Sequence, residues 1–210
     1  MRRTVDIGGA LLALVLLAPF LLGIGLLIVI TDGLPVLFRQ TRVGKNGRPF
    51  LILKFRTMRS GVPGGSITAA GDSRVTRVGG WLRRLKLDEL PQFLNVLRGE
   101  MSLIGPRPEV PDYVQYEDPL WQAVLSIRPG ITDIASLAFR DEEQLLGPVP
   151  DADRYYRAVI LPAKLRLNIL YLRSRSFMTD LRLLWLTALY SLAPSTFSRN
   201  RVLKTLRNRA

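Results

Sequence analysis

The residues best suited to chemistry are two adjacent carboxylates that follow a run of cations. Asp88 and Glu89 come directly after a segment that contains Arg83, Arg84 and Lys86. A carboxylate can act as a nucleophile, as a general acid or base, or as a ligand of a divalent cation. Because the neighbouring cations would attract an anion, the pattern indicates phosphate chemistry. The other interpretation is structural: Asp88 caps a helix and Glu89 stabilises its first turn.

The composition restricts how such a site could work. The sequence contains no His and no Cys, which excludes a Ser-His-Asp triad, a thiolate metal site and a His general base. A nucleophile or proton carrier must then be an Asp, Glu, Lys, Tyr or Ser side chain. The formal net charge of +13 requires an anionic partner, which could be a phosphorylated substrate, acidic lipid or nucleic acid.

Further cations lie in positions where the backbone is stiff. Arg107 belongs to a Gly-Pro-Arg-Pro turn and Arg128 to an Arg-Pro-Gly turn, and such turns present a guanidinium in a fixed orientation that suits bidentate phosphate binding. Lys54 and Arg56 close a short β-prone run. Together with Arg83, these side chains are candidates for a convergent cationic pocket.

The first element that must position these residues is an apolar segment. Residues 7–30 contain no charged side chain. As a helix they would extend about 36 Å at roughly 1.5 Å per residue, enough to cross an apolar layer of about 30 Å. Basic residues flank both ends, although positive charge prefers the cytoplasmic side, and Pro19 would bend the helix. Two interpretations stay open: a kinked helix that enters and leaves by one face, and a single span that tolerates the proline.

The next segments predict a hairpin and a loop. Residues 36–40 and 50–56 are β-prone, and Asn46-Gly47 between them is a strong hairpin signal. A solvated, charged edge strand is the alternative. The Gly-rich residues 60–72 predict a loop that either closes over a substrate or simply connects two elements.

Helices are expected over most of the remaining chain. Asp88 should cap a helix that ends at Gly99, which would place the acidic pair at a positive helix terminus. Residues 155–175 have helical spacing. Residues 177–192 predict an apolar helix that packs on the domain or lies in the membrane interface, where Trp and Tyr are favoured.

Two charged segments complete the pattern. The acidic residues 141–144 predict a solvated helix start. The basic residues 199–209 predict a tail that binds anionic lipid or is disordered.

Several blocks of sequence, taken in order, resemble the motifs of one known family. These blocks are Phe38-Arg-Gln40-Thr-Arg42-Val-Gly44, Lys54-Phe-Arg56-Thr-Met58, Leu87-Asp88-Glu89-Leu90-Pro91-Gln92, Asn95-Val-Leu-Arg-Gly99-Glu-Met101-Ser102, Gly105-Pro-Arg107-Pro108 and Arg128-Pro-Gly130-Ile-Thr132. The chain resembles the small monotopic phosphoglycosyl transferases, bacterial enzymes that start glycan assembly on polyprenyl phosphate. The resemblance extends over almost the whole chain.

The resemblance implies a reaction and a catalytic pair. A UDP-sugar would donate its phosphosugar to polyprenyl (undecaprenyl) phosphate, giving polyprenyl-diphosphate-sugar and UMP with the assistance of Mg²⁺. Asp88 would be the nucleophile, forming a covalent phosphosugar-aspartate in a ping-pong mechanism, with Glu89 as its partner. We assign Mg²⁺ binding to the same two carboxylates.

The resemblance also suggests which cations bind the substrates. Arg83 and Arg128 match family positions that bind phosphate. Lys54, Arg56 and Arg107 lie in matching motifs, and we assign them to substrate binding as well. The chain departs from many family members at residues 133–136, where it reads Asp-Ile-Ala-Ser in place of Gly-Trp-Ala-Gln, so the sugar is not specified.

The implied fold is mainly α with a small β-hairpin. Residues 1–33 would form a re-entrant membrane helix-break-helix kinked at Pro19. Residues 34–195 would form an α-rich catalytic domain on the cytoplasmic face of the bacterial inner membrane, with interfacial amphipathic helices. Residues 196–210 would form a basic tail. Many family members have Ser before the proline, whereas this chain has Ala18.

The expected partners are a UDP-sugar, polyprenyl phosphate and membrane lipids, and nucleic acid is not expected. The alternative is a membrane-anchored basic protein that binds nucleic acid or acidic lipid without catalysis. That alternative gives no reason for the acidic pair beside two proline-locked arginines. The chain also lacks the aromatic clusters of proteins that bind single strands.

Overall fold

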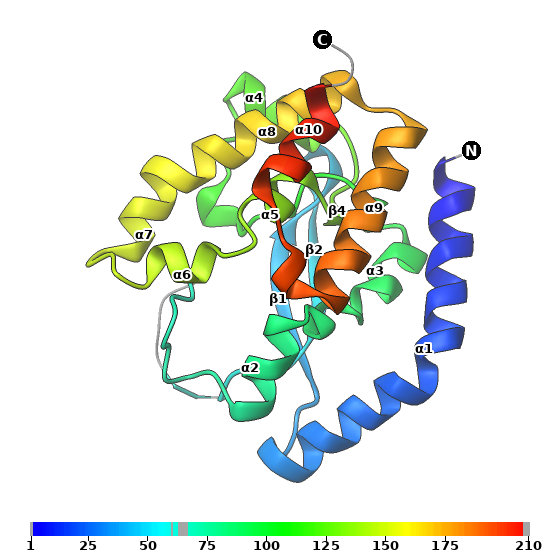
Figure 1. The fold of residues 1–210 in the computed structure, drawn as a ribbon, viewed down its shortest axis with the longest axis vertical. Helices are drawn as coiled ribbons and strands as arrows, with labels where there is room; N and C mark the ends of the chain where they lie inside the picture. Colours follow the sequence, from blue (N-terminus) through cyan, green and yellow to red (C-terminus); the bar gives the residue numbers. More distant parts are fainter. Residues whose placement is uncertain (1, 60, 63–66, 208–210) are drawn as a thin grey trace.

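The computed structural model describes residues 2–59, 61–62 and 67–207. Figure 1 shows a mostly helical molecule in which a two-stranded ribbon is surrounded by helices. The predicted combination of helices with a small hairpin is therefore confirmed. Part of the predicted Gly-rich loop, residues 60 and 63–66, lies outside the described residues.

Helix α1 (Arg2–Asp32) runs without interruption and contains Pro19. Figure 1 shows that it bends near its middle, as expected for a proline that removes one helical hydrogen bond. By length and composition α1 could cross a membrane. The predicted break is thus a bend within one continuous helix, and the re-entrant path stays a prediction.

The beginning of α1 is bound to the rest of the domain by a buried carboxylate. Asp6 accepts hydrogen bonds from the Ser102 hydroxyl at 2.9 Å and from the Leu103 amide at 3.0 Å. Arg3 donates to the Leu97 carbonyl at 3.2 Å. These polar contacts fix the first turns of an otherwise apolar helix beside β3 (Ser102–Ile104) and α3 (Gln92–Arg98).

The end of α1 is bound to the same domain by Arg56. Its guanidinium donates to the carbonyls of Asp32, Gly33 and Leu34 at 2.7, 2.5 and 2.9 Å. The last carbonyls of a helix lack partners within the helix, so a cation that donates to them is stabilising. Arg56 therefore has a clear structural role as a cap of α1.

The predicted hairpin is confirmed. Strands β1 (Leu37–Val43) and β2 (Pro49–Phe55) pair antiparallel around a turn at Lys45–Gly47. Asn46 and Gly47 both have positive φ, 57° and 75°, which explains why this turn contains Asn-Gly. The hairpin places Lys54 near the end of β2.

The two proline-containing turns are joined by a short parallel pairing of β3 with β4 (Gly130–Thr132). Gly105 and Gly130 lie in backbone contact, since a Cβ added to Gly130 would be 2.1 Å from the Gly105 nitrogen. Only glycine fits there. This contact holds the turn that carries Arg107 against the turn that follows Arg128.

The remaining helices close the core. The central apolar cluster includes Val96, Ile134, Leu183 and Tyr190. Besides the turn at Lys45–Gly47 (η1), the described residues form the 3₁₀ segments η2 (Leu87–Glu89), η3 (Pro111–Tyr113) and η5 (Pro194–Thr196), and a π-helical segment, Tyr156–Ile160, precedes α8. The other helices are α2 (Arg77–Arg84), α4 (Pro119–Leu125), α5 (Ile134–Ala138), α6 (Glu142–Leu146), α7 (Ala152–Tyr155), α8 (Leu161–Ser174), α9 (Phe177–Leu192) and α10 (Arg199–Arg207).

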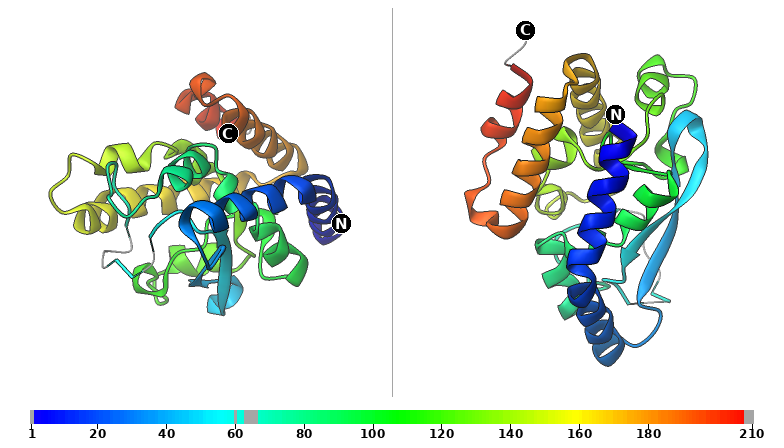
Figure 2. Two further views of the ribbon diagram at one scale, coloured as in Figure 1. Left: turned by 90° about the horizontal axis from the view of Figure 1, so that it is seen from below. Right: turned by 90° about the vertical axis from the view of Figure 1, so that its right-hand side faces the viewer.

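Helix α9 has the predicted bounds and lies beside α1, as both views of Figure 2 show. An ion pair of 3.6 Å between Arg2 and Asp180 joins the two helices. The outer face of α9 carries exposed apolar side chains such as Trp185, which is 68% exposed.

Helix α10 occupies most of the predicted basic tail, and its Val202 is fully buried, so this segment is folded. Residues 208–210 lie outside the described residues.

Candidate active site

The acidic pair lies in a tight turn between α2 and α3. Lys86 has a left-handed backbone with φ of 58°, and Asp88 and Glu89 follow in η2. Helix α3 begins only at Gln92, with Pro91 as its cap residue. The prediction that Asp88 caps this helix is therefore wrong, because the chain forms a separate 3₁₀ turn before the proline. Side-chain cations, rather than a helix terminus, surround the pair.

Glu89 is buried and held by two cations. Lys54 Nζ lies 3.0 Å from Oε1, and Arg107 donates through Nη1 to Oε2 at 3.1 Å and through Nη2 to Oε1. Burial alone would raise the pKa of Glu89, but the charges of Arg107 and Lys54 outweigh it and hold the pKa well below its usual range. Glu89 is thus an ionised carboxylate with both oxygens engaged.

Asp88 has the opposite environment. It is buried, and within the described part of the chain its Oδ1 atom has no hydrogen-bond partner. Burial raises the pKa of Asp88, the nearby Lys54 charge opposes that rise, and the Glu89 charge adds to it. A buried polar atom without a partner is costly, and a bound ligand, ion or water would satisfy it. Of the two carboxylates, Asp88 is the one with an oxygen that no described residue engages.

Lys54 is fixed in place by a residue that sequence reasoning missed. Asn95 of α3 is fully buried, accepts from the Leu53 amide at 3.0 Å and donates to the Leu51 carbonyl at 2.7 Å. It thereby continues the hydrogen bonding of β2 and sets the position of Lys54. Burial lowers the pKa of Lys54 to about 8, although the Glu89 charge opposes the change. Two polar residues three apart on the buried side of α3, Gln92 and Asn95, could have indicated this role.

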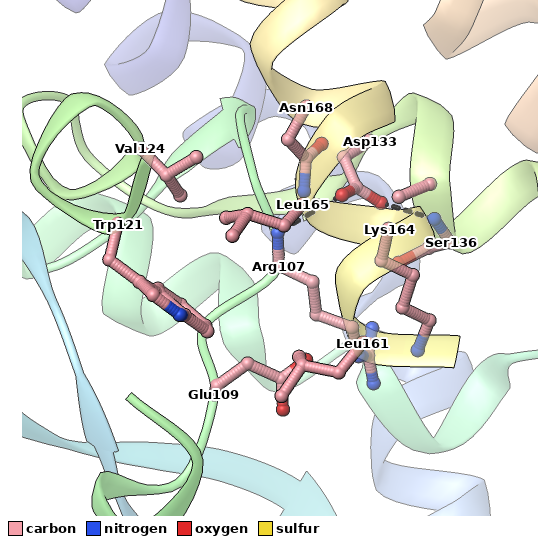
Figure 3. A pocket seen from close by; sticks show the side chains of 11 residues that line it. Arg107, Glu109, Trp121, Val124, Asp133, Ser136, Leu161, Lys164, Leu165 and Asn168 are labelled. Atoms are coloured by element: carbon pink, nitrogen blue, oxygen red, sulfur yellow. Dashed lines mark hydrogen bonds between the residues drawn. The ribbon is translucent and has the colours of Figure 1, made fainter. Parts of the chain in front are cut away.

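Arg107 is positioned by a second missed residue, Asp133. The Arg107 amide donates to Asp133 Oδ2 at 3.2 Å, and Asp133 Oδ1 caps α5 by accepting from the Ser136 amide at 2.6 Å. Both bonds are drawn in Figure 3. The sequence signal was available, because Asp133 directly precedes a helix and stands where the chain departs from the family motif.

The other predicted substrate cations have partners elsewhere. Arg56 caps α1, and Arg128 Nε donates to the Gly99 carbonyl at 2.9 Å. Arg83 pairs with Glu143 of α6, yet it lies close enough to Asp88 for its charge to lower the pKa of that carboxyl. The structure therefore brings Lys54 and Arg107 onto Glu89, places Arg83 nearby, and engages Arg56 and Arg128 with backbone carbonyls.

A small cavity lies behind Arg107 (Figure 3). Trp121 and Val124 of α4 lie on one side of it, and Lys164 and Asn168 of α8 lie on the other. Its volume of about 20 Å³ is that of a single water site, too small for a nucleotide sugar. Any substrate of that size must approach Asp88 from the surface.

The acidic pair is also a candidate metal site. The described residues contain no group of three or more acidic side chains placed to hold a metal ion. Mg²⁺, however, is commonly held by one or two carboxylates together with substrate phosphates and water. The unpartnered Asp88 Oδ1 fits that requirement. Glu89 could contribute only by exchanging a bond with Lys54 or Arg107.

Comparison with known sequences identifies the family. A family model described as bacterial sugar transferase matches residues 1–193 of the 210. The chain belongs to the bacterial sugar transferase family. This bacterial sugar transferase carries the acidic pair, Lys54 and Arg107 within the matched range.

Three curated relatives set the scale of similarity. The chain is 48% identical over 141 residues to a UDP-glucose:undecaprenyl-phosphate glucose-1-phosphate transferase of Caulobacter vibrioides, covering 65% of this chain and 53% of the relative. It is 45% identical to a UDP-N-acetylgalactosamine-undecaprenyl-phosphate N-acetylgalactosaminephosphotransferase of Aeromonas hydrophila, covering 65% and 33%. It is 38% identical to exopolysaccharide production protein PSS of Rhizobium leguminosarum bv. phaseoli, covering 91% and 95%. This sugar transferase thus matches about half of the first relative, a third of the second and nearly all of the third.

Proposed function

We propose that this bacterial sugar transferase moves the phosphosugar of a UDP-sugar onto undecaprenyl phosphate and releases UMP. The observation that carries the proposal is the division between two buried carboxylates: Lys54 and Arg107 engage both oxygens of Glu89, whereas Asp88 keeps an oxygen without a partner among the described residues. The names of the Caulobacter and Aeromonas relatives supply the substrate classes. Those two names specify different sugars, so the donor sugar is left open.

The first half-reaction uses Asp88 as the nucleophile. One carboxylate oxygen attacks the phosphorus that bears the sugar, and the bond from that phosphorus to the bridging oxygen breaks. UMP leaves with the bridging oxygen and its electron pair. The product on the protein is a phosphosugar-aspartate. Asp88 must be ionised to react, and the positive charges of Lys54 and Arg83 favour that form.

The second half-reaction restores the carboxylate. A phosphate oxygen of undecaprenyl phosphate attacks the same phosphorus, and the bond between phosphorus and Asp88 breaks. Because no proton is gained or lost in either displacement, neither needs a His. Two displacements through one intermediate predict ping-pong kinetics.

The surrounding charges make the attack of an anion on an anion possible. Arg107 and Lys54 offset the charge of Glu89, so this second carboxylate does not repel the diphosphate. When bound, Mg²⁺ would supply further positive charge at the phosphates, with Asp88 and Glu89 as the carboxylates that would hold it. Asp133 fixes the turn that carries Arg107, and Asn95 fixes the strand that carries Lys54. Both cations are therefore in position before substrate binds.

The placement of α1 supports a monotopic enzyme. Asp6 near the start of α1 and Arg56 at its end bind this helix to one domain, so both ends are held on the same body. The helix between them exposes apolar side chains such as Leu16 and Leu22, which are 69% and 75% exposed. We propose that α1 enters and leaves one leaflet from the cytoplasmic side. The exposed apolar face of α9 would lie in the interface.

The decisive experiment is Asp88→Asn in the full chain, reconstituted with undecaprenyl phosphate and a panel of UDP-sugars. Release of UMP should fall by more than about a thousandfold. The fold should persist or gain stability, because the variant removes a buried and incompletely paired acid. When wild-type protein is given a donor labelled with ³²P at the sugar phosphate, the label should become covalently bound to the protein as the phosphosugar-aspartate. Hydroxylamine should then release it.

Three results would contradict the proposal. One is full turnover by the folded Asn variant. Another is wild-type protein that stays unlabelled while it turns over. The third is a wild-type chain that releases no UMP from any UDP-sugar, which would favour a basic protein that binds lipid or nucleic acid without catalysis.

A further inference from the structure

Arg83 is held by an acidic residue from a distant part of the chain. Its Nε and Nη2 atoms both donate to Glu143 Oε1, at 3.2 and 2.5 Å. These two atoms form one edge of the planar guanidinium, and that edge is the one a phosphate group uses for bidentate binding. The carboxylate thus occupies a surface of Arg83 that suits a phosphate.

The Arg83 pair differs from the other ion pairs near Asp88 in the exposure of its carboxylate, since the three cations are all largely buried, at 18–28% exposed. The Glu143 side chain is 43% exposed, whereas Glu89, which binds Lys54 and Arg107, is 9% exposed. An exposed ion pair contributes little and is easily exchanged, whereas separating a buried pair leaves an uncompensated charge. Of these three cations, Arg83 is the one that an incoming anion can recruit at low cost.

We propose that Glu143 is an internal counter-ion that occupies the phosphate-binding edge of Arg83 until the donor diphosphate displaces it, and that it thereby sets donor affinity. This inference rests on the proposed function. Glu143 is a positioning residue rather than a catalytic one, because it would act on the donor through Arg83.

Replacing Glu143 by a phosphate group on Arg83 requires only a movement of the Glu143 side chain. The Glu143 carbonyl accepts from the Ala70 amide at 2.8 Å, and Arg140 donates to the Arg84 carbonyl at 3.2 Å. Both contacts use backbone carbonyls and stay in place when the Glu143 carboxylate turns away. Helix α6 therefore remains attached to α2 and to residue 70 in the occupied state, and Glu143→Gln should fold normally.

The test measures binding of UDP, inorganic pyrophosphate and uridine to the full chain in detergent, by calorimetry at low and high salt. Glu143→Gln should bind UDP and pyrophosphate about two- to fivefold more tightly than wild type, with the gain reduced at high salt. Uridine, which is neutral, should bind unchanged. Asp141→Asn is the matched control, since it removes one negative charge from the exposed start of the same helix. In an Arg83→Gln background, Glu143→Gln should have no further effect.

The results separate this inference from the proposed function. If wild-type protein binds UDP and releases UMP while folded Glu143→Gln binds UDP equally or more weakly, the inference is wrong and the proposed function stands. The same conclusion follows if Asp141→Asn tightens binding as much, or if the gain persists without Arg83. If wild-type protein neither binds UDP nor releases UMP, both are wrong.

Discussion

At the scale of single residues, the site separates two carboxylates that are neighbours in sequence. Glu89 is held ionised by Arg107 and Lys54, whereas burial raises the pKa of Asp88. Pushing the pKa values of adjacent acids apart is a common way of giving them different roles. Here Glu89 binds the two cations, and we propose that Asp88 carries the reactive oxygen.

Lys54 gives the site a testable pH dependence. Its pKa is lowered to about 8, chiefly by burial, so its positive charge is present below that pH and is lost as the pH rises through it. We expect kcat/KM for the UDP-sugar to fall above about pH 8, because neutral Lys54 no longer offsets Glu89. The kcat/KM profile is the proper measurement, since it reports the free enzyme.

Lys54→Arg is the matched variant for this pH test, because an arginine side chain stays charged. In this variant the fall of kcat/KM at alkaline pH should begin at a higher pH, even if the maximal kcat/KM is lower. If kcat/KM falls at the same alkaline pH in both proteins, a titratable group other than Lys54 causes the fall.

The residues that the structure gathers around the acidic pair could be singled out from sequence, but the contacts that position them could not. Asp88, Glu89, Lys54 and Arg107 were identified by residue type, by the absence of His and by motif order. Their partners lie far away along the chain: Leu53 and Asn95 are 42 residues apart, and Arg83 and Glu143 are 60 apart. Residue type gives no information about contacts that depend on tertiary packing. For the same reason Arg56 was assigned to substrate, whereas the structure places it at the end of α1.

At the scale of elements, the site depends on how β2 is attached to α3. The hairpin itself was predictable, because Asn46-Gly47 determines its turn locally. The attachment of β2 to α3 was not predictable, because it depends on one buried side-chain amide. Asn95 hydrogen-bonds to the backbone of the residues before and after Ile52. A helix and a strand are thereby joined without a third strand.

Asn95→Ala tests this attachment. The substitution leaves the Leu53 amide and the Leu51 carbonyl without their partner, and an unsatisfied buried group costs about 1–3 kcal/mol. We expect the free energy of unfolding to fall by about that amount in denaturant titrations, together with a drop in UMP release as Lys54 loses its fixed position. Leu94→Ala, on the exposed side of the same helix, is the control and should change both quantities little. Equal effects of the two substitutions would contradict the role of Asn95.

At the scale of the whole molecule, the arrangement of α1 determines how the enzyme would meet the proposed lipid substrate. The second half of α1 packs through Ile24 and Ile28 against Phe55 and Leu82, so the apolar helix adjoins α2 and the strand that carries Lys54. A lipid acceptor held near this helix would have its phosphate close to the domain surface. Hydropathy alone leaves the single span and the kinked helix equally open, because it does not reveal what the two helix ends contact. The prediction of a re-entrant helix rests on the family resemblance.

Cysteine labelling of intact and permeabilised cells distinguishes the two topologies. The chain has no native Cys, so each engineered thiol is unique. Arg2→Cys and Lys45→Cys place thiols at exposed positions at the start of α1 and in the hairpin turn beyond it. Because Asp6 and Arg56 bind both ends of α1 to one domain, we expect a membrane-impermeant maleimide to label both sites only after permeabilisation.

Leu16→Cys, exposed on the apolar surface of α1, is the control. Lipid should protect this thiol from the maleimide in intact and in permeabilised cells, and detergent should make it reactive. Labelling of Arg2→Cys in intact cells, with Lys45→Cys still protected, would instead establish a single span, and α1 would then have to separate its first turns from Ser102 and Leu103.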